Sequence, residues 1–467
     1  MKELIEQELL PVLEESVPAG KWKVYEEYRD SGVEWLGEIP AHWEARKIKF
    51  LASLETRKYF EKPDNLSYIG LEHIESGTGK LIQNTPIENV ESTMNYFAKG
   101  NVLFGKLRPY LAKVILTDFE GVCTTELLVF QPTPHLYGKY LYYRLISSDF
   151  IGLINSITYG TKMPRASSEQ VCNISVQCPS LFEQQAIATF LDHQTARIHQ
   201  LIAYKERLIE LLQERRTAVI NQAVTRGLNA NVEMKDSGVE WLGKIPAHWE
   251  VRRLKKIIYS IEQGWSPACE NRLADDEEWG VLKVGCVNGN EFNDKEHKAL
   301  PKDIKPIMEL EIRTGDILMS RANTRELLGS TSIVHNARSK LLLCDKLYRI
   351  NLSQAVLLPT FFVLAMKSSI VRFQLEREAT GASNSMQNIS QFTILNLLLP
   401  VPDIKQQEEI LSYLAQETAK IDKLISVIQD GIKKLKEYNT ALISAVVTGK
   451  IDVRGEVDGV AGEEAAL

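Results

Sequence analysis

Few residues in this 467-residue chain have the spacing that catalysis requires. Residues 76–80 read SGTGK and partly match the phosphate-binding motif G-x-x-x-x-G-K-[ST]. The match fails because Ile74 stands where the first glycine of the motif belongs. The sequence has no G-x-G-x-x-G after a strand, no H-E-x-x-H and no G-x-S-x-G. His193 and His199 are six residues apart, so they do not share a helical face. We therefore expect no catalytic residue and no bound cofactor in this chain.

The cysteine spacing, the apolar runs and the charge predict an ordinary soluble protein that binds no metal ion. The six cysteines form no C-x-x-C pair, so we expect reduced thiols in the cytoplasm, with no metal site and no disulfide. The acidic start MKELIEQELLPVLEE has no signal-peptide character, and no apolar run is long enough to span a membrane. The net charge of −6 argues weakly against nucleic acid, but residues 45–178 and 251–401 carry slightly more cations than anions. DNA binding therefore stays open.

A long duplication organises the chain. Residues 30–44 read DSGVEWLGEIPAHWE and residues 236–250 read DSGVEWLGKIPAHWE, so only Glu38 differs, as Lys244. Residues 179–202 then align without gaps to residues 402–425. The period exceeds about two hundred residues, which excludes a solenoid of short repeats and indicates a duplicated pair of domains.

Each copy ends in a segment that predicts a long helix. Residues 181–226 contain no proline or glycine, and apolar residues recur at helical spacing in both copies, every seven residues in the second. Lys205 and Arg215 occupy seam positions of the first helix, and Gly431 in the second predicts a bend or a loosening. Two such helices most simply pair antiparallel as a coiled coil, through a seam of Leu191, Ile198, Leu212, Val219, Leu414, Ile421, Ile428, Leu435 and Leu442.

The rest of each copy alternates short apolar runs with turn residues. Residues 68–74, 101–107, 126–131, 280–285 and 316–321 predict strands, and residues 139–150 and 359–375 predict helices. The expected fold is α/β (α+β): two mixed α/β domains separated by two long antiparallel helices, as a pseudo-twofold tandem repeat. The expected divisions are a helical extension (1–29), domain 1 (30–178), a long helix (179–228), a linker with domain 2 (229–401), a long helix (402–450) and a tail (451–467).

The order of these motifs resembles the specificity (S) subunit of type I restriction-modification systems, over almost the whole chain. The resemblance is carried by the doubled D-S-G-V-E-W-L-G-x-I-P-A-H-W-E, by Y-I-G-L-E-x-I-x-x-G-T-G at 68–79 and by T-G-D-I-L-x-x-R at 314–321. It continues in G-x-S/T…M before each long helix and in E/Q-Q-x-x-I-x-x-x-L at each helix start. Residues 1–20 and 451–467 lie outside the repeat.

This resemblance implies a non-catalytic, DNA-binding subunit. Two target-recognition domains would each bind one half of a bipartite, asymmetric site in double-stranded DNA, and the helices would set the unread spacer. The helices would also dock two modification (methyltransferase) subunits, which bind S-adenosylmethionine and flip out adenine. Two restriction (translocase/nuclease) subunits would use ATP and Mg, so this chain itself needs no cofactor and no membrane.

Base edges and phosphates call for cations, amides and hydroxyls on loops. In the first domain we predict DNA contacts from Lys106, Arg108, Tyr110, Tyr159, Thr161, Lys162 and Arg165. In the second we predict them from Trp265, Ser266, Arg321, Asn323, Thr324, Arg325, Ser383, Asn384, Ser385, Gln387 and Asn388. A solvated loop charge is the alternative for each cation, and packing is the alternative for Tyr110, Tyr159 and Trp265.

The repeated opening string is assigned to structure. Two domains that read different half-sites would hardly share their reading residues, so Trp35, Trp43, Trp241 and Trp249 are predicted to anchor each domain to the helices. Two other functions stay open: the specificity subunit of a type IIB-like system with a fused modification-restriction partner, and a coiled-coil scaffold that binds only protein.

Overall fold

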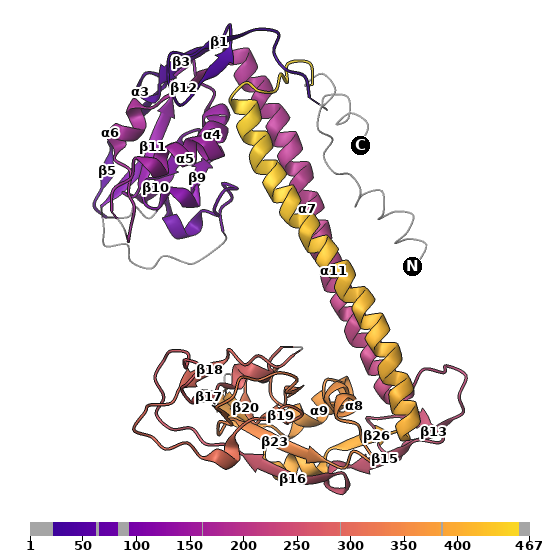
Figure 1. Ribbon diagram of the computed structural model, residues 1–467. Coiled ribbons are helices and arrows are strands. Elements are labelled where there is room, and N and C mark those ends of the chain that lie inside the picture. Colours follow the sequence, from indigo (N-terminus) through magenta and orange to yellow (C-terminus); the bar gives the residue numbers. More distant parts are fainter. Residues whose placement is uncertain are drawn as a thin grey trace. The chain divides into compact units, whose positions relative to one another are not determined.

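The computed structural model of the chain (Figure 1) describes residues 22–61, 65–82, 93–160, 162–289, 291–383 and 386–456. The chain divides into two compact units: unit 1 is Met1–Arg207 with Val427–Leu467, and unit 2 is Leu208–Ser426. Each unit contains one mixed α/β domain and one part of each of two long helices. The predicted fold class, two mixed α/β domains joined by long helices, is confirmed.

The long helices are α7 (Leu181–Arg226) and α11 (Ile404–Val447). Each begins at a capping side chain, because the Ser180 hydroxyl accepts from the Glu183 amide and the Asp403 carboxylate accepts from the Gln406 amide. Beyond the helix ends, Gly227 and Gly449 have φ of +76° and +78°, a left-handed conformation that glycine adopts at little cost. Gly431, predicted to bend or loosen the second helix, lies inside an uninterrupted α11.

Within each unit the two helices run antiparallel. In unit 1, Asp192 and Ala203 of α7 line one cleft with Asn439 and Ile443 of α11, while Lys205 lies beside Gly431. In unit 2, Arg216 of α7 forms an ion pair with Asp422 of α11 at 3.3 Å. The predicted seam is buried at Leu191, Ile198, Leu212, Leu414, Ile421, Ile428 and Leu442, and half-buried at Val219 and Leu435.

The two cations predicted in the seam differ from one another. Lys205 is buried at 5% exposure, and its Nζ lies 3.6 Å from the point where a Cβ on Gly431 would stand. Arg215 is exposed, so its predicted place in the seam is wrong, and its neighbour Arg216 faces the partner helix. Glycine therefore makes room for a long cationic side chain that could not cross a close-packed helix interface.

Mixed domain 1 is built on two four-stranded sheets, with orders β4-β11-β8-β9 and β5-β7-β10-β6. Neighbours pair antiparallel apart from β6 and β10. Apolar residues that alternate along the strands, such as Phe97, Leu103 and Cys123, meet in one cluster, so the sheets pack against each other. The strands are β4 (Ala52–Leu54), β5 (Lys58–Tyr59), β6 (Ser67–Ile69), β7 (Met94–Phe97), β8 (Val102–Gly105), β9 (Val114–Leu116), β10 (Gly121–Thr124) and β11 (Leu127–Pro132). The helices are α3 (Ile48–Leu51), η2 (Leu71–His73), η3 (Pro109–Leu111), α4 (Gly138–Ile146), α5 (Ser148–Ser156) and α6 (Ser168–Asn173).

Mixed domain 2 repeats this plan with an additional small sheet. Its sheets have orders β16-β23-β19-β21, β18-β17-β22 and β20-β25-β24. The strands are β16 (Ile258–Gln263), β17 (Gly280–Leu282), β18 (His297–Ala299), β19 (Ile317–Ser320), β20 (Ala322–Asn323), β21 (Thr331–Ile333), β22 (Leu341–Leu342), β23 (Leu347–Leu352), β24 (Thr380–Ser383) and β25 (Met386–Asn388). The helices are η4 (Leu254–Lys256), η5 (Val284–Val287), η6 (Met308–Leu310), α8 (Pro359–Met366), α9 (Ser369–Glu378) and α10 (Gln391–Asn396).

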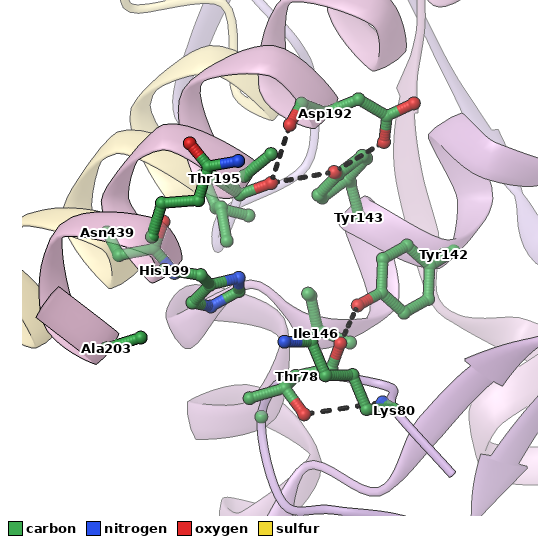
Figure 2. A pocket seen from close by; sticks show the side chains of 14 residues that line it. Thr78, Lys80, Tyr142, Tyr143, Ile146, Asp192, Thr195, His199, Ala203 and Asn439 are labelled. Atoms are coloured by element: carbon green, nitrogen blue, oxygen red, sulfur yellow. Dashed lines mark hydrogen bonds between the residues drawn. The ribbon is translucent and has the colours of Figure 1, made fainter. Parts of the chain in front are cut away.

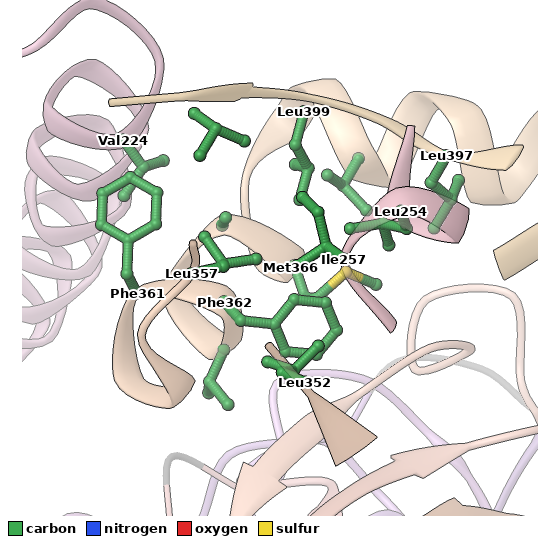
Figure 3. Close-up of a cluster of buried hydrophobic side chains, with 14 of the residues drawn as sticks. Val224, Leu254, Ile257, Leu352, Leu357, Phe361, Phe362, Met366, Leu397 and Leu399 are labelled. Carbon is green, nitrogen blue, oxygen red and sulfur yellow. The ribbon is translucent and has the colours of Figure 1, made fainter. Parts of the chain in front are cut away.

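The main core of unit 2 joins its domain to the helices. Phe361, Phe362 and Met366 of α8 pack there with Leu254 and with Val224 of α7 (Figure 3). These side chains come from elements that are far apart in the sequence, so burial of this cluster ties the domain to the helix pair.

Two helices that the sequence predicts as single are each broken once. Residues 139–150 form α4 and α5 around Ser147, and residues 359–375 form α8 and α9 around Lys367 and Ser368. Both serines have extended backbone, with ψ of 144° and 151°, and Ser368 accepts from the Val371 amide as a cap. A serine that hydrogen-bonds the backbone locally ends one helix and starts the next, which apolar periodicity does not register.

The repeated strings, residues 30–44 and 236–250, form the same structure in both units, and we call them hinge segments 1 and 2. Each carries one antiparallel pair: β1 (Tyr28–Asp30) with β2 (Glu38–Pro40), and β13 (Met234–Asp236) with β14 (Lys244–Pro246). The next strands, β3 (Glu44–Lys47) and β15 (Glu250–Arg253), pair with β12 (Ser175–Cys178) and β26 (Leu398–Val401), which lead into the long helices. Each hinge segment therefore connects its domain to the start of a long helix.

The expected terminal segments are described only in part. Residues 1–21 of the predicted helical extension lie outside the described residues, and residues 22–29 contain no helix. Of the predicted tail, residues 451–456 are described, and Val453 is fully buried in unit 1. These residues are therefore packed parts of unit 1.

Candidate nucleic-acid interface

In mixed domain 1 the fold brings together two segments that were predicted separately. Residues 106–110 follow β8, and residues 158–165 precede α6. The Arg108 amide donates to the Pro164 carbonyl at 2.8 Å, and the Ala166 amide donates to the Lys106 carbonyl at 3.0 Å. Single bridges also join Leu107 and Tyr159 to Arg165. We call this paired loop surface 1.

Loop surface 1 presents two cations and two aromatic rings to solvent. The side chains of Arg108 and Lys162 are exposed and have no hydrogen-bond or ion-pair partner among the described residues. Tyr110 and Tyr159 are 52% and 57% exposed, so neither ring is packed as the alternative interpretation required. Such a set can contact phosphates and stack on bases.

The backbone of this loop is held in an uncommon conformation. Arg108 and Ala112, on either side of the short helix η3, have φ of 50° and 46°, which costs energy for residues that carry a Cβ. The nearby Gly160 has φ of +91°, which favours glycine. Hydrogen bonds from both segments fix this turn, so the Arg108 side chain is directed by a rigid loop.

Two other predicted residues of this surface have different environments. Arg165 forms an ion pair with Glu126 at 2.8 Å, so its charge is compensated within the domain. Lys106 is half-buried beside it, and Thr161 lies outside the described residues. The second oxygen of Glu126 is buried and has no hydrogen-bond partner among the described residues.

Mixed domain 2 builds the equivalent surface from β20, β24 and β25. The Ile389 amide donates to the Arg321 carbonyl at 3.0 Å, and β20 pairs antiparallel with β25 through Ala322 and Asn388. Gln387 lies in β25 opposite Asn323. We call this loop surface 2; its Ser383 is placed only as a residue of β24, and Asn384 and Ser385 lie outside the described residues.

Side chains of loop surface 2 are more strongly bound within the domain than those of loop surface 1. Arg321 donates to the Asp345 carbonyl at 3.3 Å, and Arg325 lies 3.4 Å from Glu376. Asn323 donates to Asn288 at 2.8 Å and accepts from the Thr324 amide. A ligand here would meet a preorganised polar network, in which several partners must exchange on binding.

The turn with Trp265 and Ser266 faces the core more than predicted. The Trp265 ring packs against the apolar cluster of β17, β19 and β22, so packing is the better interpretation of this residue. Ser266 hydrogen-bonds Asp345, the residue whose carbonyl accepts from Arg321. A Cβ on Gly264 would lie 2.2 Å from the Leu343 carbonyl oxygen, so only glycine allows this close approach.

Sequence reasoning missed two residues of loop surface 2. Asn288 contacts Asn323, and Lys346 is an exposed cation whose carbonyl accepts from the Arg321 amide. Both lie more than about twenty residues away in the sequence, in segments without a distinctive motif. No local signal identifies them, because strand pairing alone brings them to the surface.

The SGTGK segment has a different role from the phosphate loop that it partly matches. It forms one wall of a cleft of about 530 Å³ in unit 1, whose opposite wall is α7 (Figure 2). Tyr142 donates to the Thr78 carbonyl at 2.7 Å, and a Cβ on Gly79 would lie 2.6 Å from the Tyr142 ring. Burial and the nearby Lys80 lower the pKa of His199 in this cleft. The segment is therefore fixed by packing.

No metal site is evident in the described part of the chain. No group of three or more His, Cys, Asp or Glu residues that could hold a metal ion occurs there. Among the described helices, none is long and apolar enough to cross a membrane. All six cysteines are free thiols.

Comparison with known proteins identifies this architecture. Residues 40–211 match the family model of the type I restriction modification DNA specificity domain. The specificity subunit of the type I restriction enzyme EcoEI from Escherichia coli is 30% identical over 205 residues, 44% of this chain but only 34% of that protein. The specificity subunit of the type I enzyme MjaVIII from Methanocaldococcus jannaschii is 24% identical over 89% of this chain and 94% of that protein.

A solved structure has the same fold. It was described in a study of complex assembly and conformational transition of the type I R-M system, and it aligns with a TM-score of 0.63 over 88% of this chain and 98% of that chain. Sequence identity there is 16%, so the likeness concerns the fold. Residues 40–211 therefore match the type I restriction modification DNA specificity domain, and over most of its length the chain is similar in sequence to the specificity subunits of type I restriction enzymes.

Proposed function

We propose that this chain recognises a bipartite, asymmetric site in double-stranded DNA, with mixed domain 1 reading one half and mixed domain 2 the other. The observation that supports this most directly is the doubled loop surface. Both domains pair a segment after β8 or β19 with a segment before α6 or α10. The backbone arrangement is shared, while the side chains differ, which two readers of different base sequences require.

Loop surface 1 is suited to phosphate contact and stacking, through Arg108, Lys162 and two exposed tyrosines. Loop surface 2 is suited to hydrogen bonds with base edges, through Asn323, Gln387 and Asn388, with Arg321 beside them. Amide side chains pair well with adenine and cations with guanine. The two surfaces would therefore select different half-sites, and the whole site would be asymmetric.

The long helices supply the spacing and the docking surface in this proposal. A helix of 46 residues extends over roughly 65–70 Å, or about two turns of DNA at about 34 Å each. The helices also expose apolar side chains, among them Tyr204 of α7 and Val427 of α11 in unit 1, and Leu211 of α7 and Tyr413 of α11 in unit 2. Exposed apolar residues on a paired helix are a surface for further helices.

Two modification and two restriction subunits are the proposed partners. S-adenosylmethionine, ATP and Mg would be bound by these partners in this proposal. The type IIB-like arrangement differs only in having one kind of partner chain. Co-purification from cells separates the two, because it yields either two partner chains or one fused chain.

The proposal is tested by the methylation pattern of the assembled complex. The purified complex with S-adenosylmethionine is reacted with unmethylated genomic DNA, which is then sequenced for methyladenine. The expected result is methylation at one bipartite motif with a fixed spacer, and a change in one half only when loop surface 1 is altered. Methylation at no bipartite motif would leave the protein-binding scaffold as the better explanation.

A further inference from the structure

Different parts of the chain contact the two hinge segments. In unit 2 the chain runs without interruption from α7 through residues 227–233 into β13. In unit 1 the corresponding place holds two separate stretches, residues 449–454 after α11 and residues 22–27 before β1. They are joined by hydrogen bonds: the Asp452 amide donates to the Lys23 carbonyl at 2.8 Å, and the Tyr28 hydroxyl donates to the Gly449 carbonyl at 3.0 Å.

At the centre of each hinge, a tryptophan and a histidine share one acceptor from a long helix. In unit 1 the Trp43 indole donates to a Glu183 oxygen at 3.2 Å, and His42 Nε2 lies 2.9 Å from the same oxygen. In unit 2 the Trp249 indole donates to the Gln406 oxygen at 3.0 Å, with His248 Nε2 at 3.1 Å. Glu183 and Gln406 occupy the same position of the repeat, so a carboxylate has replaced an amide at one hinge only.

What covers this acceptor also differs. In unit 2 a cavity of about 260 Å³ lies beside it, lined among others by Gly227, Val232 and Gln406. In unit 1 the Tyr25 ring packs on Trp43 with ring centres 5.5 Å apart, and the Arg454 guanidinium lies over Tyr25 at 4.9 Å. Residues from the two separate stretches therefore cover the hinge in unit 1.

The carboxylate of Glu183 needs a compensating charge, because its side chain is only 5% exposed. Arg454 Nε lies 4.0 Å from the Glu183 oxygen and is oriented by Asp452 at 2.7 Å. His42 is the other basic group that faces this carboxylate. The hydrogen bonds that Arg454 donates to the Asp452 carboxylate raise the pKa of Arg454 above its ordinary value, so this cation stays charged.

We propose that residues 449–454 are a strap that holds hinge segment 1 on the helix pair, and that Glu183 and Arg454 are the positioning residues that fasten it. Unit 2 needs no such pair because its linker is covalent, and an amide suffices as the acceptor there. Attachment of mixed domain 1 therefore depends on a charge pair, and attachment of mixed domain 2 does not. This inference concerns the chain alone and does not rest on the proposed DNA recognition.

The test is hydrogen-exchange mass spectrometry of the full chain with the isosteric variant Glu183→Gln. The variant keeps the acceptor for Trp43 as Gln406 does for Trp249, and it removes the charge together with the second oxygen, which accepts from the Ser180 hydroxyl. We expect exchange of residues 22–28 and 449–454 to rise on the order of fivefold, with residues 234–250 unchanged. Unchanged protection of residues 449–454, or an equal rise at both hinges, would contradict the strap.

Further variants separate the charge pair from general loss of packing. Arg454→Met should raise exchange to the same extent, Arg454→Lys should restore most of the protection, and the double variant with Glu183→Gln should be no worse than either single variant. Adding salt should raise exchange of residues 22–28 in the wild type but not in Arg454→Met. Additive effects in the double variant, or no response to salt in the wild type, would overturn the pairing.

The reciprocal variant Gln406→Glu is the matched control in unit 2. It places a carboxylate at the hinge that has no strap, where Arg226 lines the neighbouring cavity but no carboxylate such as Asp452 orients an arginine toward it among the described residues. We expect faster exchange of residues 234–250 and no change at residues 449–454. A carboxylate tolerated without effect both in Gln406→Glu and in the double variant with Arg226→Met would show that Glu183 needs no partner either, and the role of Arg454 would be excluded.

Discussion

At the residue scale, two cations predicted on loop surface 1 differ in whether an acidic side chain already compensates their charge. The Arg108 guanidinium has no partner among the described residues, and the backbone of Arg108 lies in a turn with φ of 50° that hydrogen bonds hold in place. Arg165, equally predicted from sequence, is occupied by Glu126. Free cations contribute to DNA affinity more directly than cations that must first break an ion pair.

Arg108→Ala and Arg321→Ala should each weaken specific DNA binding by the assembled complex, by about tenfold to a hundredfold. Lys99→Ala and Arg313→Ala are matched controls, because these exposed cations lie beyond the opposite ends of β8 and β19. Binding is measured by titration of a duplex that carries the methylated motif, at two salt concentrations. Equal losses of DNA affinity in a variant and its control would show that the binding depends on the net positive charge of the domain and not on the position of the arginine.

The cysteines give a prediction that is independent of DNA. Burial raises the pKa of the Cys123 thiol and of the Cys344 thiol to about 12, and it also raises the pKa of Cys286. Since the thiolate is the reactive form, these three should not react with a thiol reagent at about pH 8 until the protein unfolds. Cys172, Cys178 and Cys269 are half-buried and should react first. Counting modified cysteines by mass spectrometry decides this, and early labelling of Cys123 would contradict its burial.

At the element scale, the helix pair carries a buried cation that it does not neutralise. Burial lowers the pKa of Lys205, and no hydrogen-bond or ion-pair partner for it occurs among the described residues. Lys205→Met replaces the ammonium by an apolar group of similar length, so we expect a gain in stability of about 1 kcal/mol. Thermal unfolding of the full chain measures this gain.

The lowered pKa of Lys205 also predicts how the stability of the protein changes with pH. Because the pKa of Lys205 is lower in the folded state than its ordinary 10.5, the unfolded state binds more protons between the two values. Wild-type stability relative to Lys205→Met should therefore rise as the pH approaches about 10.5. If the difference in the free energy of unfolding between the wild type and Lys205→Met stays constant from about pH 7 to about pH 10, then Lys205 is not desolvated.

Alanine variants at two hinge glycines distinguish the cost of backbone strain from the cost of overpacking. A Cβ on Gly449 would stand 2.5 Å from Pro40, whereas a Cβ on Gly32 would meet nothing within 4 Å, and both glycines have positive φ. Gly32→Ala should cost about 1 kcal/mol from its backbone alone, and Gly449→Ala about 2–4 kcal/mol, because overpacking adds to it. Denaturant unfolding measures both variants, and equal losses would mean that the hinge relaxes around the new methyl group.

At the scale of the whole molecule, the doubled plan predicts how the spacer of the DNA site is set. Insertion of one heptad into each long helix adds about 10 Å, or about three base pairs at 3.4 Å each, while the seam stays in register. The methylome of the altered complex should show the same two half-sites with a longer spacer. Insertion into α7 alone breaks the register and should abolish methylation. An unchanged spacer in the double insertion would remove the helices from this role.

The two halves of the molecule differ where the sequence repeat is otherwise strongest. Hinge segments 1 and 2 are nearly identical in sequence, yet one is covered by Tyr25 and Arg454 and the other lies beside a cavity. The difference arises from the residues that meet each hinge, which lie outside the repeated string.

The sequence by itself determined the features that depend on nearby residues. The duplication, the long helices, most of the apolar seam and the structural role of the repeated tryptophans were predicted from spacing and residue type, and Trp43 and Trp249 are buried. These features are encoded within a few turns or a few residues, so a single sequence suffices to predict them.

Only the tertiary structure decided which distant residues meet. The pairing of Arg108 with Pro164, the ion pair that occupies Arg165, the breaks at Ser147 and Ser368 and the contact of Arg454 with Glu183 have no signature in local periodicity. Strand pairing and burial bring these groups together across long stretches of chain, and the chemistry of each contact depends on the partner. The sequence therefore predicted the domain plan, while the exposed charges that we propose contact DNA, and the proposed strap at one hinge, appear only in the folded chain.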